Sequence, residues 1–458
     1  MKQATQTDKL LDSVKRVHMI GIGGSGMFPI AQILHSKGYI LSGSDNNESD
    51  ILKKVRKLGI PVTLGHKAEN ITDAELVIYS AAIMRTNPEI VQAEKMGIPT
   101  MERSYALGAI SRKFDNCIGV CGTHGKTTVS SMLTQVLYCA DKDPSAVIGG
   151  YLPIIDGYGR SGNSDTFVCE SCEYVDTFLK LTPDVAVVLN IDNDHLEYFK
   201  TMENMCLSYK KFTDMAHTVI ANGDDKLVMN TLNEYHGNII TFGFDKNNDY
   251  YAENIKMHTG VRASFDLYNK GKYLFTIDLA IPGKHNMYNA LACAVSAINC
   301  GVEQDKIIEG IAGFKGAGRR FEVLGVKKGI TIADDYAHHP AELNATLSAA
   351  MEMGYDNVWA VFQPFTYSRT KMLMDDFAKV LQIPDKVVMS EIMGSREINT
   401  DGVYTSQLAE KIPGSVWFDT FEEIADYIVQ NAKSGDLVIT LGCGDIYKAA
   451  KIMLEKLD

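Results

Sequence analysis

Short apolar runs alternate with amphipathic stretches over the first hundred residues of the chain. The apolar runs at 17–22, 39–44 and 76–82 have the length of buried strands. The segments 27–38 and 51–59, which lie between them, repeat apolar residues at helical spacing. Strands that alternate with helices form parallel sheets with helices on their faces. The pattern therefore predicts an N-terminal Rossmann-like domain.

A second alternation of the same kind begins at Asn116. A strand candidate at 117–121 runs through a glycine-rich segment into an apolar-periodic helix, and further strand candidates follow at 167–171, 185–191 and 217–223. From about residue 240 the chain changes to polar, aromatic-rich alternation, which predicts an antiparallel extension of this domain. A helix that begins near His285 and the segment 313–324 then complete it.

A third alternation fills the rest of the chain, with strand candidates in the segments 329–333, 358–365, 386–392 and 436–444. We therefore predict an α/β protein of three domains. These are an N-terminal Rossmann-like domain at 1–112, a central α/β domain of the P-loop ATPase type at 113–318, and a C-terminal Rossmann-like domain at 319–458.

Composition narrows the function classes. The chain has 458 residues, of which 45% are hydrophobic, and this is enough to form several hydrophobic cores. A formal net charge of −12 argues against nucleic acid or an anionic membrane as the main partner. The chain has no signal-like start and no apolar stretch of the roughly 20 residues that a membrane helix needs, so we expect a cytoplasmic protein without membrane insertion. The nine cysteines are expected to be free thiols.

The first glycine motif follows a predicted strand and precedes a predicted helix. Gly21, Gly23 and Gly26 have G-x-G-x-x-G spacing, and Asp45 ends the next strand. Such glycines let the backbone approach a pyrophosphate. The motif by itself leaves three interpretations open: a nicotinamide cofactor, another diphosphate ligand, or a tight turn.

The second glycine motif is more specific. It comprises Gly122, Thr123, His124, Gly125, Lys126, Thr127 and Thr128 between a strand and a helix. Backbone amides, a lysine and a hydroxyl in this setting suit nucleotide phosphates and Mg²⁺. The motif departs from the strict P-loop formula, because Val120 stands where the first glycine is expected. We expect ATP as its ligand.

Acidic residues follow the neighbouring strands of the central domain. Glu173 comes just after the strand candidate 167–171, and His195 ends an acidic segment at 190–195. Ligands of parallel sheets bind at the carboxyl ends of strands, so both residues are expected to face the same phosphates as Thr127. Mg²⁺ is the expected metal.

The C-terminal domain carries a second group of candidates at 334–340, which contains two aspartates, two histidines and a helix-opening proline. Such residues suit substrate orientation or proton transfer near neutral pH, and helix capping is the structural alternative. Three arginines, Arg319, Arg320 and Arg369, are candidate anion clamps.

Taken together, these segments resemble the Mur ligases of peptidoglycan synthesis over almost the whole chain. The resemblance rests on many motifs in order: GIGGSGM (21–27), YSAAI (79–83), GTHGKTT (122–128), ESCEY (170–174), NIDNDH (190–195), PGKHNMYNALA (282–292), GRRFE (318–322), DDYAHHPAE (334–342), QPFTYSRT (363–370) and GCGDI (442–446). It implies a three-domain, ATP- and Mg²⁺-dependent ligase that joins an amino acid, L-alanine, to the carboxylate of UDP-N-acetylmuramate in cell wall biogenesis.

The resemblance also implies roles for individual residues. The UDP-sugar would contact Gly21, Gly23, Gly24, Ser25, Gly26, Asp45 and Ser80. ATP would be held by the loop 122–128, including Lys126, and by Asn286 and Arg320, and the metal by Thr127, Glu173 and His195. The amino-acid side would be lined by Tyr336, His338, His339 and Arg369, with His338 or His339 taking the proton of the amine.

One position departs from the family pattern, because Phe365 stands where a histidine usually follows the Gln-Pro pair. Two alternative functions are a recycling ligase that attaches a tripeptide to the same UDP-sugar and an NAD-dependent dehydrogenase. The dehydrogenase would leave the second loop unused. A preference for alanine over glycine or serine, and dimerisation, are left open by the sequence.

Overall fold

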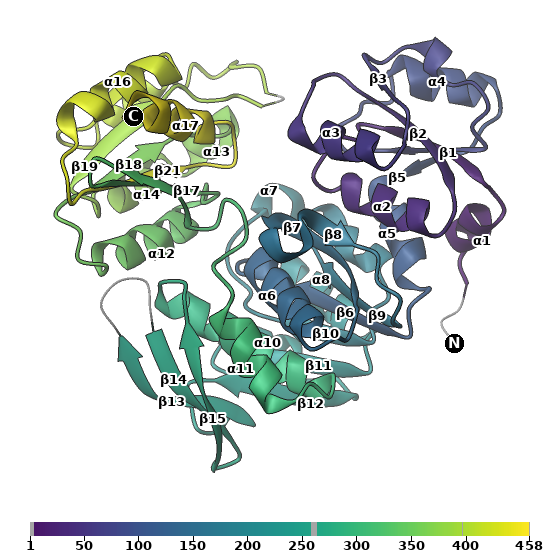
Figure 1. Ribbon diagram of the computed structural model, residues 1–458, viewed down its shortest axis with the longest axis horizontal. Coiled ribbons are helices and arrows are strands. Elements are labelled where there is room, and N and C mark those ends of the chain that lie inside the picture. The colour runs from purple at the N-terminus through teal and green to yellow at the C-terminus, as the bar shows by residue number, and fades with distance from the viewer. Residues whose placement is uncertain (1–3, 258–262, 396, 458) are drawn as a thin grey trace. The chain divides into compact units, whose positions relative to one another are not determined.

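The computed structural model describes residues 4–257, 263–395 and 397–457, and it contains three sheets with helices beside them (Figure 1). The strands and helices of all three predicted alternations are present. The α/β fold class is therefore confirmed.

The first sheet has the strand order β3-β2-β1-β4-β5, and its strands are parallel. They are β1 (Arg16–Ile20), β2 (Ile40–Asp45), β3 (Val62–Leu64), β4 (Leu76–Tyr79) and β5 (Thr100–Glu102). The helices are α1 (Gln6–Asp12), α2 (Phe28–Ser36), α3 (Asp50–Lys57), α4 (Pro88–Lys95) and α5 (Arg103–Ser111), with a 3-10 turn η1 (Ala68–Asn70). The order reverses between β1 and β4, which is where such sheets bind ligands.

The second sheet has the order β15-β14-β13-β12-β11-β10-β6-β9-β7-β8. Its strands are β6 (Asn116–Cys121), β7 (Ser145–Leu152), β8 (Gly157–Arg160), β9 (Thr166–Glu170), β10 (Val185–Val188), β11 (Thr218–Asn222), β12 (Asn238–Gly243), β13 (Tyr250–Met257), β14 (Ala263–Asn269) and β15 (Lys272–Leu279). The central strands β9, β6, β10, β11 and β12 pair in parallel. A two-residue turn, Lys270–Gly271, with positive φ at both positions, joins β14 and β15 as a hairpin.

The second sheet is accompanied by α6 (Lys126–Cys139), α7 (Leu196–Phe199), α8 (Met202–Thr213), α9 (Lys226–Thr231), α10 (Lys284–Asn299), α11 (Gln304–Ala312) and the 3-10 segments η2 (Pro153–Ile155) and η3 (Tyr174–Lys180). One core runs through the first and second sheets. The Phe114 and Phe167 rings stack at 4.9 Å within it. This shared core makes the first two predicted domains one compact unit, which comprises most of the chain up to Ile311.

The third sheet has the order β16-β17-β21-β18-β19-β20 and belongs to the second compact unit, which contains the chain from Ala312 onward. Its strands are β16 (Glu322–Lys327), β17 (Ile330–Asp335), β18 (Val358–Phe362), β19 (Lys386–Ser390), β20 (Val416–Phe418) and β21 (Leu437–Leu441). The helices are α12 (Pro340–Met351), α13 (Tyr367–Met372), α14 (Met374–Val380), α15 (Thr405–Ala409), α16 (Phe421–Asn431) and α17 (Tyr447–Lys456). The bounds predicted at 112 and 318 stay predictions.

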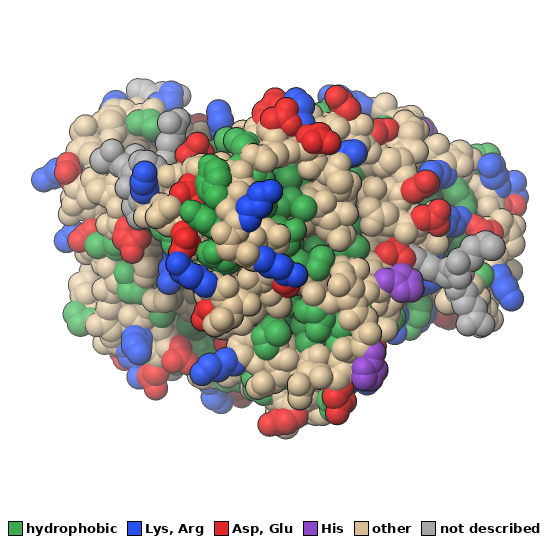
Figure 2. Space-filling view, turned by 90° about the horizontal axis from the view of Figure 1, so that it is seen from below, with side chains coloured by type: hydrophobic (Ala, Val, Ile, Leu, Met, Phe, Trp, Pro, Cys, Tyr) green, Lys and Arg blue, Asp and Glu red, His purple; other side chains and the backbone are tan. Residues whose placement is uncertain are grey.

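The surface agrees with the charge of the sequence. On the face shown in Figure 2, the described Lys and Arg side chains are scattered among acidic ones and form no continuous basic surface. Within the described ranges, no helix combines the length and the apolar character that crossing a bilayer requires.

Candidate active site

The glycine-rich loop after β1 lies where the ends of three strands meet. The Gly23 N–H donates to Oδ2 of Asp45, which ends β2, over 3.0 Å. The Ser80 N–H, just after β4, donates to the Ile20 carbonyl over 3.1 Å. A Cβ added to Gly21 would lie 3.3 Å from that of Ser80. Residues that the sequence assigned to a UDP-sugar site are thus brought together at the strand-order reversal.

Arg103 is a further candidate for binding a diphosphate at this loop, and the sequence reasoning missed it. It opens α5, and its Nη1 would lie 3.3 Å from a Cβ on Gly26. Gly24 and Ser25 belong to the same turn. A guanidinium beside a glycine-rich strand-to-helix loop adds the positive charge that a diphosphate requires. Its position after β5, at the same sheet edge, is the signal that could have found it.

We expect Gly23→Ala to damage the first loop. A Cβ there would lie 2.8 Å from the Leu52 side chain and 2.9 Å from the Asp45 carboxylate, so the loop has to shift, at a cost of about 1–3 kcal/mol. A lower melting temperature and a higher KM for the UDP-sugar are expected. Gly24→Ala is the matched control, because its nearest contact would be 3.3 Å. Equal effects of both substitutions on stability would contradict the packing argument.

The second loop, between β6 and α6, is fixed by the segment that follows β10. The Thr123 and His124 N–H groups donate to the backbone and side-chain oxygens of Asn190 over 3.1 and 2.8 Å. The Asp192 N–H donates to Thr123 Oγ1 over 2.9 Å. The acidic segment predicted to face the phosphates therefore shapes the loop itself.

Two glycines give this loop its form, with φ values of 140° at Gly122 and 89° at Gly125. Gly125 is the N-cap of α6 and offers no side-chain acceptor to the first-turn amides. A Cβ there would lie 2.5 Å from Oδ1 of Asn289, a buried residue of α10 that the sequence reasoning missed. With Thr127 and Thr128 in the first turn, this helix end is suited to bind an anion.

Lys126 and Glu173 form a buried ion pair beneath the loop. Lys126 Nζ lies 3.0 and 2.9 Å from the two Glu173 oxygens and also donates to the Gly122 and Thr123 carbonyls over 2.6 and 3.0 Å. Burial opposes the lysine charge, but the carboxylate overrides it, so the pKa of Lys126 is raised. Glu173 is fully buried.

His195 lies beside this pair, with Nε2 3.9 Å from Glu173 Oε1 and its ring 4.7 Å from that of Tyr174. Its backbone φ of 55° is unusual for a residue other than glycine. The described residues contain no group of three or more His, Cys, Asp or Glu side chains that could enclose a metal. One carboxylate, one imidazole and the Thr127 hydroxyl fit Mg²⁺ that is held mainly by nucleotide phosphates.

In the second unit, the Arg319 guanidinium is engaged in structural hydrogen bonds. It donates to Asp334 Oδ2 and to the Gly442 and Gly444 carbonyls over 2.8, 2.6 and 2.9 Å. The Tyr336 ring lies 5.0 and 5.1 Å from the Arg319 and Arg320 guanidinium carbons. Arg320 and Arg369 therefore stay the candidate anion clamps.

Asp335 is buried at the end of β17 and accepts hydrogen bonds from the Phe321 and Ala337 N–H groups, at 2.7 and 2.8 Å. Burial raises its pKa to about 6, against the opposing charge of Arg320. Asn286, which the resemblance assigns to ATP binding, belongs to the second unit, is buried, and donates to the Pro282 carbonyl over 2.6 Å.

The two adjacent histidines have different environments. His338 Nδ1 lies 3.1 Å from both the Tyr336 carbonyl and Glu342 Oε2. Because both neighbours are acceptors, Nδ1 carries the proton in the neutral ring and Nε2 is left as the acceptor. His339 is instead the N-cap of α12, where Nδ1 accepts from the Ala341 N–H over 3.4 Å. The geometry favours His338 as the proton acceptor.

Comparison with known proteins agrees with this arrangement. Models of the Mur ligase family match residues 16–115 (its catalytic domain), 120–297 (its middle domain) and 319–444 (its glutamate ligase domain). A UDP-N-acetylmuramate–L-alanine ligase of Acetivibrio thermocellus is 43% identical over 96% of both chains. One of the same name from Caldanaerobacter subterraneus is 41% identical, over 97% of this chain and 98% of the relative. The chain belongs to the Mur ligase family.

Solved structures extend the comparison. The Mur ligase is similar to the crystal structure of a UDP-N-acetylmuramate–alanine ligase from Thermotoga maritima, with a TM-score of 0.84 and 27% identity over 96% of this chain and 98% of the other. A murein peptide ligase from Psychrobacter arcticus has a TM-score of 0.75 and 22% identity over 97% and 99% of the two chains, which shows a shared fold alone. The three-domain architecture of this Mur ligase is thereby established.

Phe365, the departure from the family pattern, faces the candidate base of the Mur ligase. Its ring centroid lies 6.5 Å from that of His338, with the planes at 72°. An aromatic edge here supplies packing but no hydrogen bond. Whatever polar contact a histidine would make at this position has to come from other residues.

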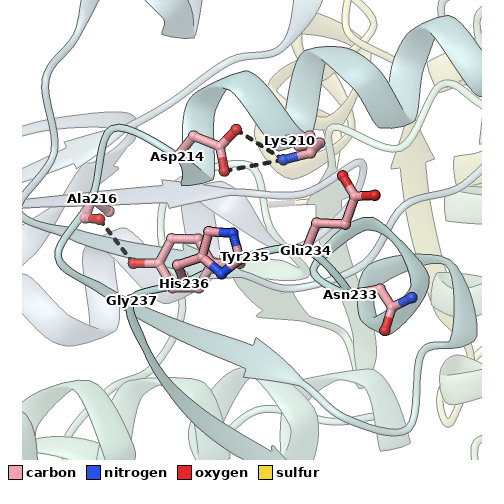
Figure 3. A pocket seen from close by; sticks show the side chains of 8 residues that line it. All are labelled: Lys210, Asp214, Ala216, Asn233, Glu234, Tyr235, His236 and Gly237. Carbon is pink, nitrogen blue, oxygen red and sulfur yellow. Dashed lines mark hydrogen bonds and ion pairs between the residues drawn. The ribbon is translucent and has the colours of Figure 1, made fainter.

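A shallow pocket of the Mur ligase lies away from this chemistry (Figure 3). Its lining includes Ala216, two residues before β11, and Gly237, which directly precedes β12. It is therefore at the amino edge of the second sheet, opposite to the edge that carries the phosphate loop. Lys210, in the same lining, pairs with Asp214 at 3.1 Å.

Substitution of each histidine of this Mur ligase should separate their roles. His338→Ala removes the candidate base and is expected to lower kcat about 10²-fold. His339→Ala removes a helix cap and is expected to cost about 1 kcal/mol of stability with little change in kcat. Steady-state rates and thermal unfolding measure both. A larger kcat loss for His339→Ala than for His338→Ala would reverse the assignment.

Proposed function

We propose that the chain catalyses the ATP-dependent ligation of L-alanine to the lactyl carboxylate of UDP-N-acetylmuramate, an early step of peptidoglycan precursor synthesis. Identity above 40% to ligases of that name over nearly the whole chain supports the substrates. The observation that carries the chemistry is the buried contact of Lys126 with Glu173 under the N-terminus of α6.

The physical problem is that a carboxylate is a poor electrophile and repels the phosphate donor. The α6 N-terminus and Lys126 supply positive charge at the nucleotide phosphates, so the sugar carboxylate can attack the γ-phosphate and form an acyl phosphate, with ADP as the leaving group. To reach those phosphates, Lys126 exchanges its loop-carbonyl partners for phosphate oxygens. Mg²⁺, when bound by Thr127, Glu173 and His195 together with the phosphates, would supply further charge neutralisation.

The second half-reaction joins the amino acid. The neutral amine of L-alanine attacks the acyl carbon, inorganic phosphate leaves, and the amine proton passes to Nε2 of His338. Arg320 and Arg369 offer guanidinium groups for the phosphate or the substrate carboxylate.

Phosphate release from ATP tests this proposal. It should require UDP-N-acetylmuramate and an amino acid together, and a panel of L-alanine, glycine and L-serine should favour L-alanine. Turnover with a tripeptide in place of an amino acid would favour the recycling ligase. A strong preference for another amino acid would overturn the named substrate but not the ligase class, and reduction of NAD would point to a dehydrogenase.

A further inference from the structure

Tyr209 is a buried polar residue that the mechanism above does not use. It lies in α8 and is fully buried, and its hydroxyl has no hydrogen-bond partner among the described residues. Most buried hydroxyl groups in proteins are hydrogen-bonded, because an unpaired one lowers stability. An unpaired phenol in the interior therefore requires an explanation.

Packing directs this hydroxyl towards the phosphate loop. Phe212, one turn later in α8, fills the space beside Gly119 of β6, where a Cβ would lie 2.8 Å from its ring. Phe178 packs on both aromatic rings, with centroids 5.4 Å from Tyr209 and 4.7 Å from Phe212. Because residues three apart in a helix share a face, Tyr209 lies beside the end of β6, next to Cys121, where the loop begins.

The neighbours of the phenol belong to the nucleotide site. Burial raises the pKa of Tyr209 well above the usual range of a phenol. The Glu173 carboxylate raises it further, and Cys121 and Cys172 make smaller contributions in the same direction. The Thr123 hydroxyl opposes this rise in pKa as a nearby hydrogen-bonding group would. It already bonds to the Asp192 backbone, however, and it is not within hydrogen-bond geometry of the phenol oxygen. The phenol therefore stays neutral, with an O–H to donate.

We propose that Tyr209 is a nucleotide-site residue whose O–H donates to an oxygen of the bound nucleotide–metal complex, either a phosphate oxygen or a metal-bound water. The proposal rests on the proposed function, since it requires a nucleotide at the loop 122–128. It explains why an unpaired hydroxyl is retained: it is paired only when the ligand is present.

Two tyrosine-to-phenylalanine substitutions test this proposal by opposite outcomes. Tyr209→Phe removes a hydroxyl that is unpaired in the ligand-free protein. Its melting temperature should be unchanged or a few degrees higher, whereas the Kd for Mg–ADP, measured by calorimetry, should rise about tenfold. Tyr235→Phe is the matched control, because its hydroxyl donates to the Ala216 carbonyl over 2.8 Å at the opposite sheet edge (Figure 3). Its melting temperature should fall and its Kd should not change.

Repeating the titration with ADP in EDTA identifies the oxygen. Weakening with and without Mg²⁺ indicates a phosphate oxygen, and weakening only with Mg²⁺ indicates a metal-bound water. An unchanged Kd in both media, or a melting temperature that falls while Kd is unchanged, overturns the proposal. If the unsubstituted protein carries out the ligation, only the role of Tyr209 is then lost. If the unsubstituted protein neither binds Mg–ADP nor releases phosphate, the proposed function fails first.

Discussion

Lys126→Ala is expected to lower kcat/KM of ligation by about 10²–10³-fold. The substitution removes the ammonium group that pairs with Glu173 beneath the phosphate loop, and loss of one preorganised charge-stabilising donor costs about 10²–10³ in rate. It should also destabilise the ligand-free protein by about 3–5 kcal/mol, because Glu173 is left as a buried carboxylate without its cation. Phosphate release and urea unfolding measure the two effects.

The double substitution Lys126→Ala with Glu173→Gln separates these effects. Removing both charges should recover much of the stability, since no unpaired charge is left in the interior, but it should recover none of the activity. Ligation by Lys126→Ala within tenfold of the unsubstituted rate would contradict the proposed role of the loop. Recovery of activity in the double variant would show that the lysine acts only on stability.

Glu173→Gln alone is expected to lower the rate about 10²-fold or more and to raise the Mg²⁺ concentration that gives half-maximal rate. Gln keeps the shape of the side chain but loses the only carboxylate that contacts Lys126 among the described residues. The pKa of Lys126 should fall, because the carboxylate is what raises it against burial. The lysine charge is then lost at lower pH, so the alkaline limb of the pH–rate profile should move to lower pH.

Glu170→Gln is the matched control for this substitution. Glu170 lies three residues earlier, at the end of β9, and its carboxylate accepts from the Gly149 N–H over 2.8 Å. Mg²⁺ titrations of the rate should therefore shift for Glu173→Gln and stay near the unsubstituted curve for Glu170→Gln. Equal Mg²⁺ dependence in all three proteins would remove Glu173 from the metal site.

The sequence by itself determined the fold class and the two glycine loops. Both loops are local, because the strand, the turn residues and the following helix are contiguous, so Gly21–Gly26 and Gly122–Thr128 could be found without long-range information. Glu173 and His195 were found through the rule that parallel strands end at one edge. The sequence also indicated the family, because its motifs follow one another in the order typical of Mur ligases.

Only the tertiary structure decided the residues that reach the site from elsewhere. Asn289 and Tyr209 have no local signal, since an asparagine in a helix and a tyrosine in an apolar stripe look the same whether or not they face a ligand. The position of Arg103 after β5 indicates the sheet edge, but only folding brings its guanidinium to Gly26. His338 and His339 were equivalent in sequence, and the acceptors around one Nδ1 and the donor beside the other made them different. Whether a polar group is paired depends on neighbours far away in the chain, and only folding brings them together.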